Sequence, residues 1–453
     1  MANGSAKHAA LTKLYVALVS DNLSELCYPA KQAGLNSVIY DHMRGFSVRI
    51  SGFNDKQHFL LTRIIQELRN PHIDEVVFHR IKAGLREELE DAGRAKPYKQ
   101  IISEVPNLLV QPYWTSAELM VALRSLTAAE LRAFVPSLLE RISLVALAHG
   151  NLLRSEAIAL RAAVAEGLWK GATAAAVPKG RVIKLVAGDE FVRQLGIDHP
   201  DSTIAIYFQG SDKSDAVVAR FSLLRQIIAA AFCREIRTDQ QLGYVVFSVL
   251  MPLLGTPGIS FVVQSPTTDP GSLERQIEYF IMHYADTVAR MSIGEFEQYK
   301  HVLLNEALVG EESLKERSNR YWEEINREEY RFASRKRIAQ AVRNITKEDF
   351  EEFYRGFMMA ERRRRLIVKL FGTAHSSLGL AEEHATEKNK GNRTLIKDRN
   401  LFAKGKEFFS LLSPPRVTLK RGSALQEFGR QDREGERTFF CSIPRHAAAL
   451  VKA

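Results

Sequence analysis

The chain has 453 residues, 45% of them hydrophobic and 26% charged, a composition that supports ordinary globular cores in about two or three domains. The net charge of +10 is uneven, because residues 374–453 carry fifteen Lys and Arg against nine Asp and Glu. The other 373 residues share a charge of only +4. The basic character belongs to a tail, so the globular part gives no strong electrostatic case for a nucleic-acid partner.

Cysteines and terminal segments indicate a compartment. Cys27, Cys233 and Cys441 form no C-x-x-C pair and cannot all be paired with one another, which is typical of a reducing environment. The N-terminus lacks a signal-peptide pattern, and the C-terminus lacks a peroxisomal address. The apolar runs are shorter than the roughly 18–20 residues that a membrane span needs. We therefore expect a cytoplasmic chain without membrane contact.

Hydrophobic periodicity and turn residues place the expected elements in chain order. In the first part, Thr115 and Thr127 each begin a helix with capping-box spacing. The small, Pro-containing stretch 170–179 interrupts the pattern and predicts a linker. The expected helices are 11–26, 54–68, 74–92, 155–168, 213–235, 272–290, 295–308, 312–328, 333–343 and 347–358. The expected strands are 35–40, 45–51, 142–148, 181–186, 202–209, 242–250, 258–265 and 366–371.

The order of elements recurs, and some of the residues recur with it. Residues 45–51 (GFSVRIS) align with 258–264 (GISFVVQ), and residues 127–150 correspond to 346–372. We predict an α+β fold of two tandem homologous domains, each a mixed or antiparallel sheet flanked by helices. The predicted organisation is repeat 1–169, linker 170–179, repeat 180–373 and a basic, partly disordered tail 374–453.

One stretch at 234–248, REIRTDQQLGYVVFS, combines a helix end with the mouth of a strand. Arg237 and Tyr244 then lie on the rim of a sheet. Arginine is a permanent donor and tyrosine keeps its proton at neutral pH, so neither is a base. Together they can hold a carbonyl and stabilise the negative charge that develops on it. The plainer interpretation is that Arg237 caps a helix C-terminus and Tyr244 is an ordinary strand aromatic.

The internal repeat distinguishes these two interpretations. At the same register the first repeat has Ala30 and Ser37. The pair Arg237 and Tyr244 is therefore dispensable for the architecture, which favours the functional interpretation.

Motifs that would activate water or a nucleophile are absent from the sequence. It contains neither H-x-x-E-H nor H-E-x-x-H, and no G-x-S-x-G elbow or P-loop. His72, Glu75 and His79 are more typical of a solvated helix face than of a metal site. Cys233 lies on an apolar helix face and suits a core position better than a nucleophile. The run 362–365 (RRRR) is expected to be a solvated turn.

Several blocks resemble the C-terminal half of the insulysin (insulinase) family, which are inverzincin metallopeptidases. They are Arg237-Thr238 with 241–248 (QLGYVVFS), 52–57 (GFNDKQ), His149-Gly150-Asn151, Tyr321-Trp322 and 346–349 (TKED). The resemblance extends from about Leu14 to about Thr373. It implies the third and fourth of four domains that enclose a chamber, with the first strand of the third missing.

The family's zinc is bound by the N-terminal half, so the resemblance implies that this chain binds no metal itself. Residues at the positions of Arg237 and Tyr244 reach the scissile peptide carbonyl in the family. The family has Phe four residues before the Arg; here that position is Cys233 and the Phe is Phe232. Phe232 and Cys233 are therefore the candidate substrate-binding pair, in a pocket of altered shape.

The expected function is that of the C-terminal half of a zinc metalloendopeptidase, inactive alone and completed by an N-terminal zinc-bearing half. Peptides are the expected substrates, and a homo-oligomer is left open. One alternative is a catalytically inactive peptide-binding or scaffold protein derived from the family. Another is a nucleic-acid binder acting through the tail, whose affinity would fall steeply with salt.

Overall fold

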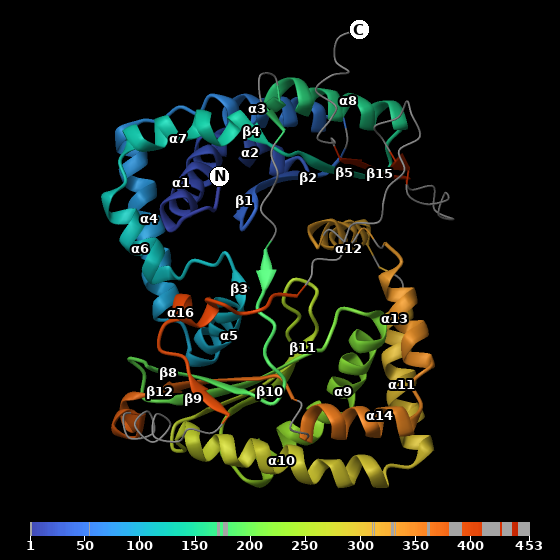
Figure 1. The fold of residues 1–453 in the computed structure, drawn as a ribbon. Helices are drawn as coiled ribbons and strands as arrows, with labels where there is room; N and C mark the ends of the chain where they lie inside the picture. Colours follow the sequence, from blue (N-terminus) through green and yellow to red (C-terminus); the bar gives the residue numbers. More distant parts are fainter. Residues whose placement is uncertain are drawn as a thin grey trace.

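The computed structural model arranges the chain as two stacked α+β halves (Figure 1). It describes all residues except those given at the end of this paragraph, and most of the expected linker and tail therefore lie outside the described residues. The residues not described are 1, 54, 170–172, 175–179, 310, 312, 328–329, 331, 360–362, 380–391, 410–425, 428–436 and 443–453.

The C-terminal half is built on one six-stranded sheet in the order β10-β11-β9-β12-β8-β13. β8 is parallel to β12 and β13, whereas β9 pairs antiparallel with β11 and β12, and β10 with β11. β9, β11 and β12 are buried along their whole length, as their nearly continuous apolar sequences require. The strands are β8 Glu190–Gly196, β9 Ser202–Gln209, β10 Val245–Leu250, β11 Gly258–Ser265, β12 Arg365–Phe371 and β13 Arg393–Leu395.

Helices cover one face of this sheet and form the larger core with it (Figure 1). Their starts are capped by side chains: Ser214 accepts from the backbone N–H of Val217, and Asp269 from that of Ser272. Each cap satisfies a backbone donor that has no partner inside the helix. The helices are α9 Asp215–Cys233, α10 Pro270–Arg290, α11 Ile293–Leu308, α13 Ser334–Arg343 and α14 Lys347–Tyr354, with π-helical turns η2 Arg234–Asp239 and η3 Arg355–Met359.

The N-terminal half repeats the order of elements but not one continuous sheet. β1 and β2 form a separate two-stranded hairpin, while β5 pairs with β15 from the tail. Both capping boxes, at Thr115 and Thr127, are confirmed. The main elements are α1 Ala6–Asn22, α2 Ser24–Gln32, β1 Leu35–His42, β2 Gly45–Gly52, α3 Gln57–Arg69, α4 Glu75–Gly93, α6 Ser116–Ser125, α7 Ala128–Glu140, β5 Val145–Gly150 and α8 Arg154–Val164.

Short elements connect these parts. The first group falls within residues 110–182, where β3 pairs with β7 and β4 with β6, and the second group follows β12. They are η1 Ala165–Trp169, β3 Val110–Gln111, β4 Arg141–Ile142, β6 Thr173–Ala174 and β7 Arg181–Val182, then η4 Thr373–His375, α16 Arg399–Ala403, β14 Gln426–Glu427 and β15 Arg437–Ser442.

The two halves exchange one helix each. Helix α5 (Pro97–Leu109) belongs to the first half in sequence but packs on the open face of the six-stranded sheet, where Ile101 and Val105 join its core. Helix α12 (Leu314–Asn326) belongs to the second half but lies against the strands of the first. There Trp322 Nε1 donates to the Tyr40 hydroxyl at 3.0 Å. Each half therefore packs one of its helices against the strands of the other half.

Several features differ from the sequence expectation. Strands β8 and β13 and helix α5 were not predicted, and the helix expected at 11–26 is divided into α1 and α2. The predicted solvated arginine turn is wrong for Arg363 and Arg365: Arg363 pairs with Glu278 at 2.7 Å, and the buried Arg365 pairs with Glu190 and Glu278. Glu190 and Glu278 form a carboxylate cluster at the start of β12 and neutralise these arginines. An arginine can be buried there because its charge is paired.

The segment Asp215–Asp239 is long and apolar enough to cross a membrane by composition alone. Its apolar residues have another explanation, because Ile227, Ile228 and Phe232 are buried in the core against the sheet. This helical segment is therefore the central core helix of the C-terminal half.

Candidate functional site

The stretch that carries Arg237 and Tyr244 is a tight connection from α9 to β10. Helix α9 widens into the π-helical turn η2, in which the Gln240 backbone N–H donates to the Glu235 carbonyl at 2.9 Å. Gln241 takes a positive φ of 53°. A Cβ on Gly243 would lie 2.5 Å from the Gln264 carbonyl oxygen, so only glycine lets the chain approach β11 this closely. The turn delivers Tyr244 directly to the start of β10.

Arg237 lies in the last turn of η2 with its side chain exposed. Within the described part of the chain it makes no hydrogen bond or ion pair. Its charge is favourable at this helix end, as the plainer interpretation expected. A guanidinium that no other side chain engages is also free to donate to a ligand.

Tyr244 is half exposed, with 51% of the residue accessible, and its hydroxyl makes two hydrogen bonds. The hydroxyl donates to Asp201 Oδ2 at 2.6 Å and accepts from Gln264 Nε2, also at 2.6 Å. Gln264 Nε2 donates to Asp201 Oδ2 as well, at 2.7 Å. Asp201 and Gln264 are both buried, so the three side chains form a closed triangle at the sheet rim.

Asp201 affects the proton of Tyr244. The hydrogen bond to Asp201, together with partial burial and the carboxylate charge, raises the pKa of Tyr244 above its ordinary value of 10.0. The N–H of Gln264 acts in the opposite direction, because it stabilises the phenolate and lowers this pKa. The net rise keeps Tyr244 protonated throughout the neutral range.

The exchanged helix α5 fixes the orientation of Gln264. The backbone N–H of Tyr98, in the first turn of α5, donates to Gln264 Oε1 at 3.1 Å. Because Oε1 faces this donor, the amide nitrogen must face Asp201 and Tyr244. The Tyr98 ring also packs edge-on against Phe247 with centroids 6.4 Å apart. The first half thus contributes to a site on the second.

Sequence reasoning missed Asp201, Gln264 and Tyr98. One signal was available for Gln264, because it is a polar residue that directly follows the apolar run 261–263 within the strand expected at 258–265. A buried amide needs partners, and a search for them leads to this triangle.

The two candidate substrate-binding residues have different surroundings. Phe232 is fully buried and packs against Phe261 and Phe280 with ring centroids 5.0 and 5.3 Å away. Its side chain therefore has no surface for a peptide in this structure, and its role is in the core. Cys233 is a free, partly exposed thiol on the neighbouring position of α9.

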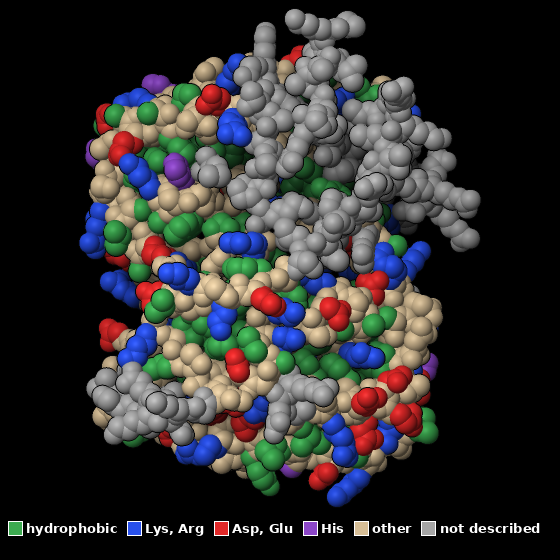
Figure 2. Space-filling view, viewed as in Figure 1, with side chains coloured by type: hydrophobic (Ala, Val, Ile, Leu, Met, Phe, Trp, Pro, Cys, Tyr) green, Lys and Arg blue, Asp and Glu red, His purple; other side chains and the backbone are tan. Residues whose placement is uncertain are grey.

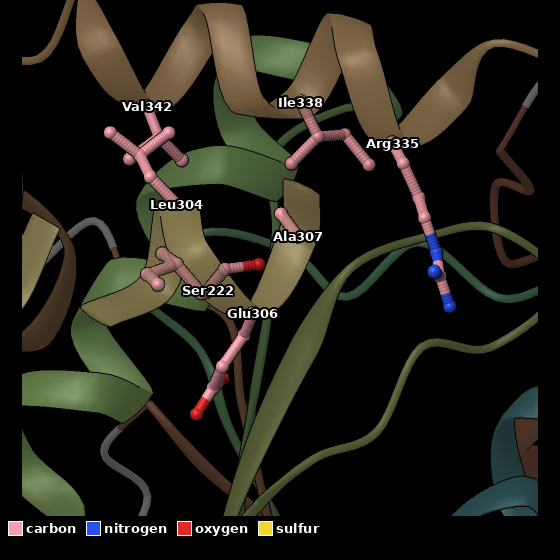
Figure 3. Close-up of a pocket in the computed structure, with 8 residues that line it drawn as sticks. Ser222, Leu304, Glu306, Ala307, Arg335, Ile338 and Val342 are labelled. Carbon is pink, nitrogen blue, oxygen red and sulfur yellow. The ribbon is translucent and has the colours of Figure 1, made fainter. Parts of the chain in front are cut away.

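A cavity of about 250 Å³ lies elsewhere, between α9, α11 and α13 (Figure 3). Figure 3 shows the charged ends of Glu306 and Arg335 pointing away from the apolar side chains of Leu304, Ile338 and Val342. Its lining includes neither Arg237 nor Tyr244. The cavity is therefore separate from the Tyr244 site.

No group of three His, Cys, Asp or Glu side chains suited to a metal ion occurs among the described residues. Glu75, one of the three weak candidates, instead pairs with Arg132 at 3.0 Å. On the face shown in Figure 2, Lys and Arg are interspersed with Asp and Glu over both halves. The described residues on that face form no extended single-sign patch for a highly charged partner.

Two family models match the chain, one in each half. Residues 1–122 match the middle or third domain of peptidase M16. Residues 223–322, which include the C-terminal part of α9 together with η2 and β10, match the C-terminal lobe domain 4 of the PQQ synthase PqqF-like proteins. The chain is insulysin-like and corresponds to the C-terminal half of M16 peptidases.

The relatives agree with this assignment. Human insulin-degrading enzyme is 30% identical over 369 residues, which cover 80% of this chain and 36% of that protein. The insulin-degrading enzyme of Drosophila melanogaster is 27% identical, over 89% of this chain and 42% of its own length. The A-factor-processing enzyme of Saccharomyces cerevisiae is 28% identical, over 80% and 35%. The M16 chain described here thus spans little more than a third of the relatives it matches.

Solved structures support the same fold. Pitrilysin superimposes with a TM-score of 0.78 at 19% identity, over 91% of this chain and 43% of its own. A peptidase M16 inactive domain from Pseudomonas fluorescens gives a TM-score of 0.59 at 15% identity, over 82% of this chain and 90% of its own. These superpositions show that the chain shares the fold of these structures, and the α+β prediction is confirmed.

Proposed function

We propose that this chain acts as the C-terminal half of an insulinase-family zinc metalloendopeptidase. In this proposal it encloses a peptide together with an N-terminal half that holds the zinc. Its own contribution is Arg237 and Tyr244, which hold the peptide carbonyl and stabilise the charge that develops on it.

One observation carries the proposal. Arg237 makes no hydrogen bond or ion pair within the described residues, while Tyr244 is half exposed and its hydroxyl is anchored. An unengaged guanidinium and a phenol whose proton is held by Asp201 thus lie at the rim of a sheet whose repeat partner has Ala30 and Ser37 at the same register. Resemblance to insulin-degrading enzymes supplies the substrate class, a peptide. The described residues do not suit zinc, so the proposal assigns the metal to the other half.

The test is peptide hydrolysis by this chain with zinc, alone and mixed with the N-terminal half of an insulysin-like enzyme. Activity only in the mixture supports the proposal. Peptide binding without hydrolysis in either case favours the alternative, a non-catalytic peptide-binding scaffold. Hydrolysis by the chain alone would contradict the assignment of the metal to the other half.

Tyr244→Phe should lower kcat of the mixture on the order of 10²–10³, because it removes one donor to the developing oxyanion. KM should change less, since the donor acts mainly in the transition state. The matched control is Tyr279→Phe, an exposed tyrosine on α10. Steady-state kinetics of both variants give the answer, and unchanged turnover in Tyr244→Phe would remove Tyr244 from the mechanism.

A further inference from the structure

We propose that Asp201 and Gln264 are positioning residues for Tyr244, and that Asp201 competes with a bound peptide carbonyl for the tyrosine proton. The inference rests on the proposed function for its catalytic consequence. Its structural part concerns the hydroxyl alone and can be tested without catalysis.

The hydrogen-bond inventory of the triangle carries the argument. A phenolic hydroxyl has one proton, and in this structure that proton points to Asp201 Oδ2, 2.6 Å away. An ionised carboxylate only accepts, so this direction follows from the chemistry of the pair. Gln264 Nε2 occupies one acceptor position on the Tyr244 oxygen. What remains toward solvent is an unshared electron pair, which is an acceptor.

A peptide carbonyl is also an acceptor, so it cannot bind to Tyr244 in this arrangement without a change. The O–H must rotate from Asp201 to the carbonyl, and the carboxylate then keeps the N–H of Gln264 at 2.7 Å as its partner. The hydrogen bond from Gln264 holds the phenolic oxygen in place during this rotation. Charge on the carbonyl oxygen strengthens it as an acceptor, so the exchange becomes more favourable as an oxyanion develops.

The anchor of the triangle comes from the other half of the molecule. Gln264 is oriented by the backbone N–H of Tyr98 at the start of the exchanged helix α5. Displacement of α5 would therefore free the Gln264 amide and with it the Tyr244 oxygen. Correct docking of the two halves is a condition for a positioned Tyr244.

The direct test is the titration of Tyr244 in the full chain labelled with ¹³Cζ-tyrosine, with the resonance assigned by Tyr244→Phe. The range from pH 8 upward is used. His199, whose ring accepts the Asp201 backbone N–H, is an ionisable neighbour of Asp201. Asp201→Asn should lower the pKa of Tyr244, because the charged acceptor is lost. Gln264→Met should raise it, because the donor that stabilises the phenolate is lost.

The two variants should shift the pKa of Tyr244 in opposite directions. Simple unfolding would instead lower it toward the ordinary value in both variants, so the titration separates the inference from loss of structure. Asp198→Asn is the matched control, an exposed aspartate three residues away that loses the same charge. A Tyr244 pKa that responds equally to Asp201→Asn and Asp198→Asn would overturn the inference, as would a fall in Gln264→Met.

Kinetics of the mixture with the N-terminal half then test the catalytic consequence. Asp201→Leu removes the anchor and should lower kcat by up to about 10²-fold with little change in KM. Asp201→Asn keeps an acceptor of the same shape and should restore most of this loss. If the titration shifts are as expected but Tyr244→Phe does not change turnover, the hydrogen-bonded triangle is supported and the proposed function is contradicted. Equal losses of kcat in the Leu and Asn variants would contradict the positioning role.

Discussion

Single residues decide whether the β10 rim can form at all. Gly243 allows its backbone to lie against the Gln264 carbonyl, and the next residue, Tyr244, donates its N–H to the same oxygen at 3.2 Å. A side chain at 243 would push Tyr244 away from the triangle. The candidate site thus depends on a residue that has no chemistry of its own.

Gly243→Ala should lower the free energy of unfolding by about 1–3 kcal/mol, because the added methyl must displace strand β11 or the turn. Gly84→Ala is the control: it sits inside helix α4, where nothing lies within 4 Å of the new methyl. That variant should be more stable by about 0.5–1 kcal/mol. Urea unfolding of both variants measures the difference, and a neutral Gly243→Ala would show that the turn relaxes freely.

At the scale of elements, strand β15 takes an unexpected place. In the second half β12 has β9 as its antiparallel neighbour, and β9 immediately precedes the first core helix of that half. The corresponding strand of the first half is β5, and its antiparallel neighbour is β15 from the tail. β15 therefore occupies the topological position of β9, which gives the tail a structural role in the first half.

A chain ending at residue 436 should lose protection from hydrogen exchange at the backbone amides of β5, because β15 supplies its ladder partners. The amides of β12 should stay protected in the same sample, since its neighbours remain. A chain ending at residue 442 retains β15 and should behave as the full chain does. Equal protection of β5 in both truncations would contradict the role assigned to β15.

Across the whole molecule, the exchanged helices α5 and α12 make the two halves interdependent. α5 places Ile101, Val105, Leu108 and Leu109 in the core on the open face of the six-stranded sheet, each at most 1% exposed. Burial of four such side chains is worth on the order of 6–12 kcal/mol. That is comparable with the whole stability of an ordinary domain, so neither half should persist without the other's helix.

Residues 175–453 expressed alone should aggregate, because the sheet face that α5 covers is exposed. Co-expression with residues 1–174 should recover a soluble complex of one copy of each. The full chain with a protease site inserted after residue 174 is the control, and after cleavage its two pieces should co-elute in size-exclusion chromatography. A soluble, monomeric 175–453 fragment with native spectra would show that the halves are independent.

Local patterns were enough for much of the fold. Periodicity and caps predicted β9 at 202–209, β11 at 258–265 and most helices of both repeats to within a few residues, because each is specified by its own side chains. Helix α5 was missed, and α1 and α2 were expected as one helix. The repeat and the insulysin-like resemblance also came from residues alone. The domain boundaries and the roles of Arg237 and Tyr244 stay predictions.

Long-range pairing could not be read in this way. The partners of Tyr244 come from positions 98, 201 and 264, and no local pattern connects such distant residues. The sequence pattern around Phe232 does not distinguish a pocket position from a core position. The packing of α9 on β11 decides that Phe232 is in the core. The positions of strand β13 and of the exchanged helices depend on which sheet edge or sheet face the other elements leave uncovered. Side-chain pattern specifies an element, whereas the competition among surfaces for burial specifies its neighbours.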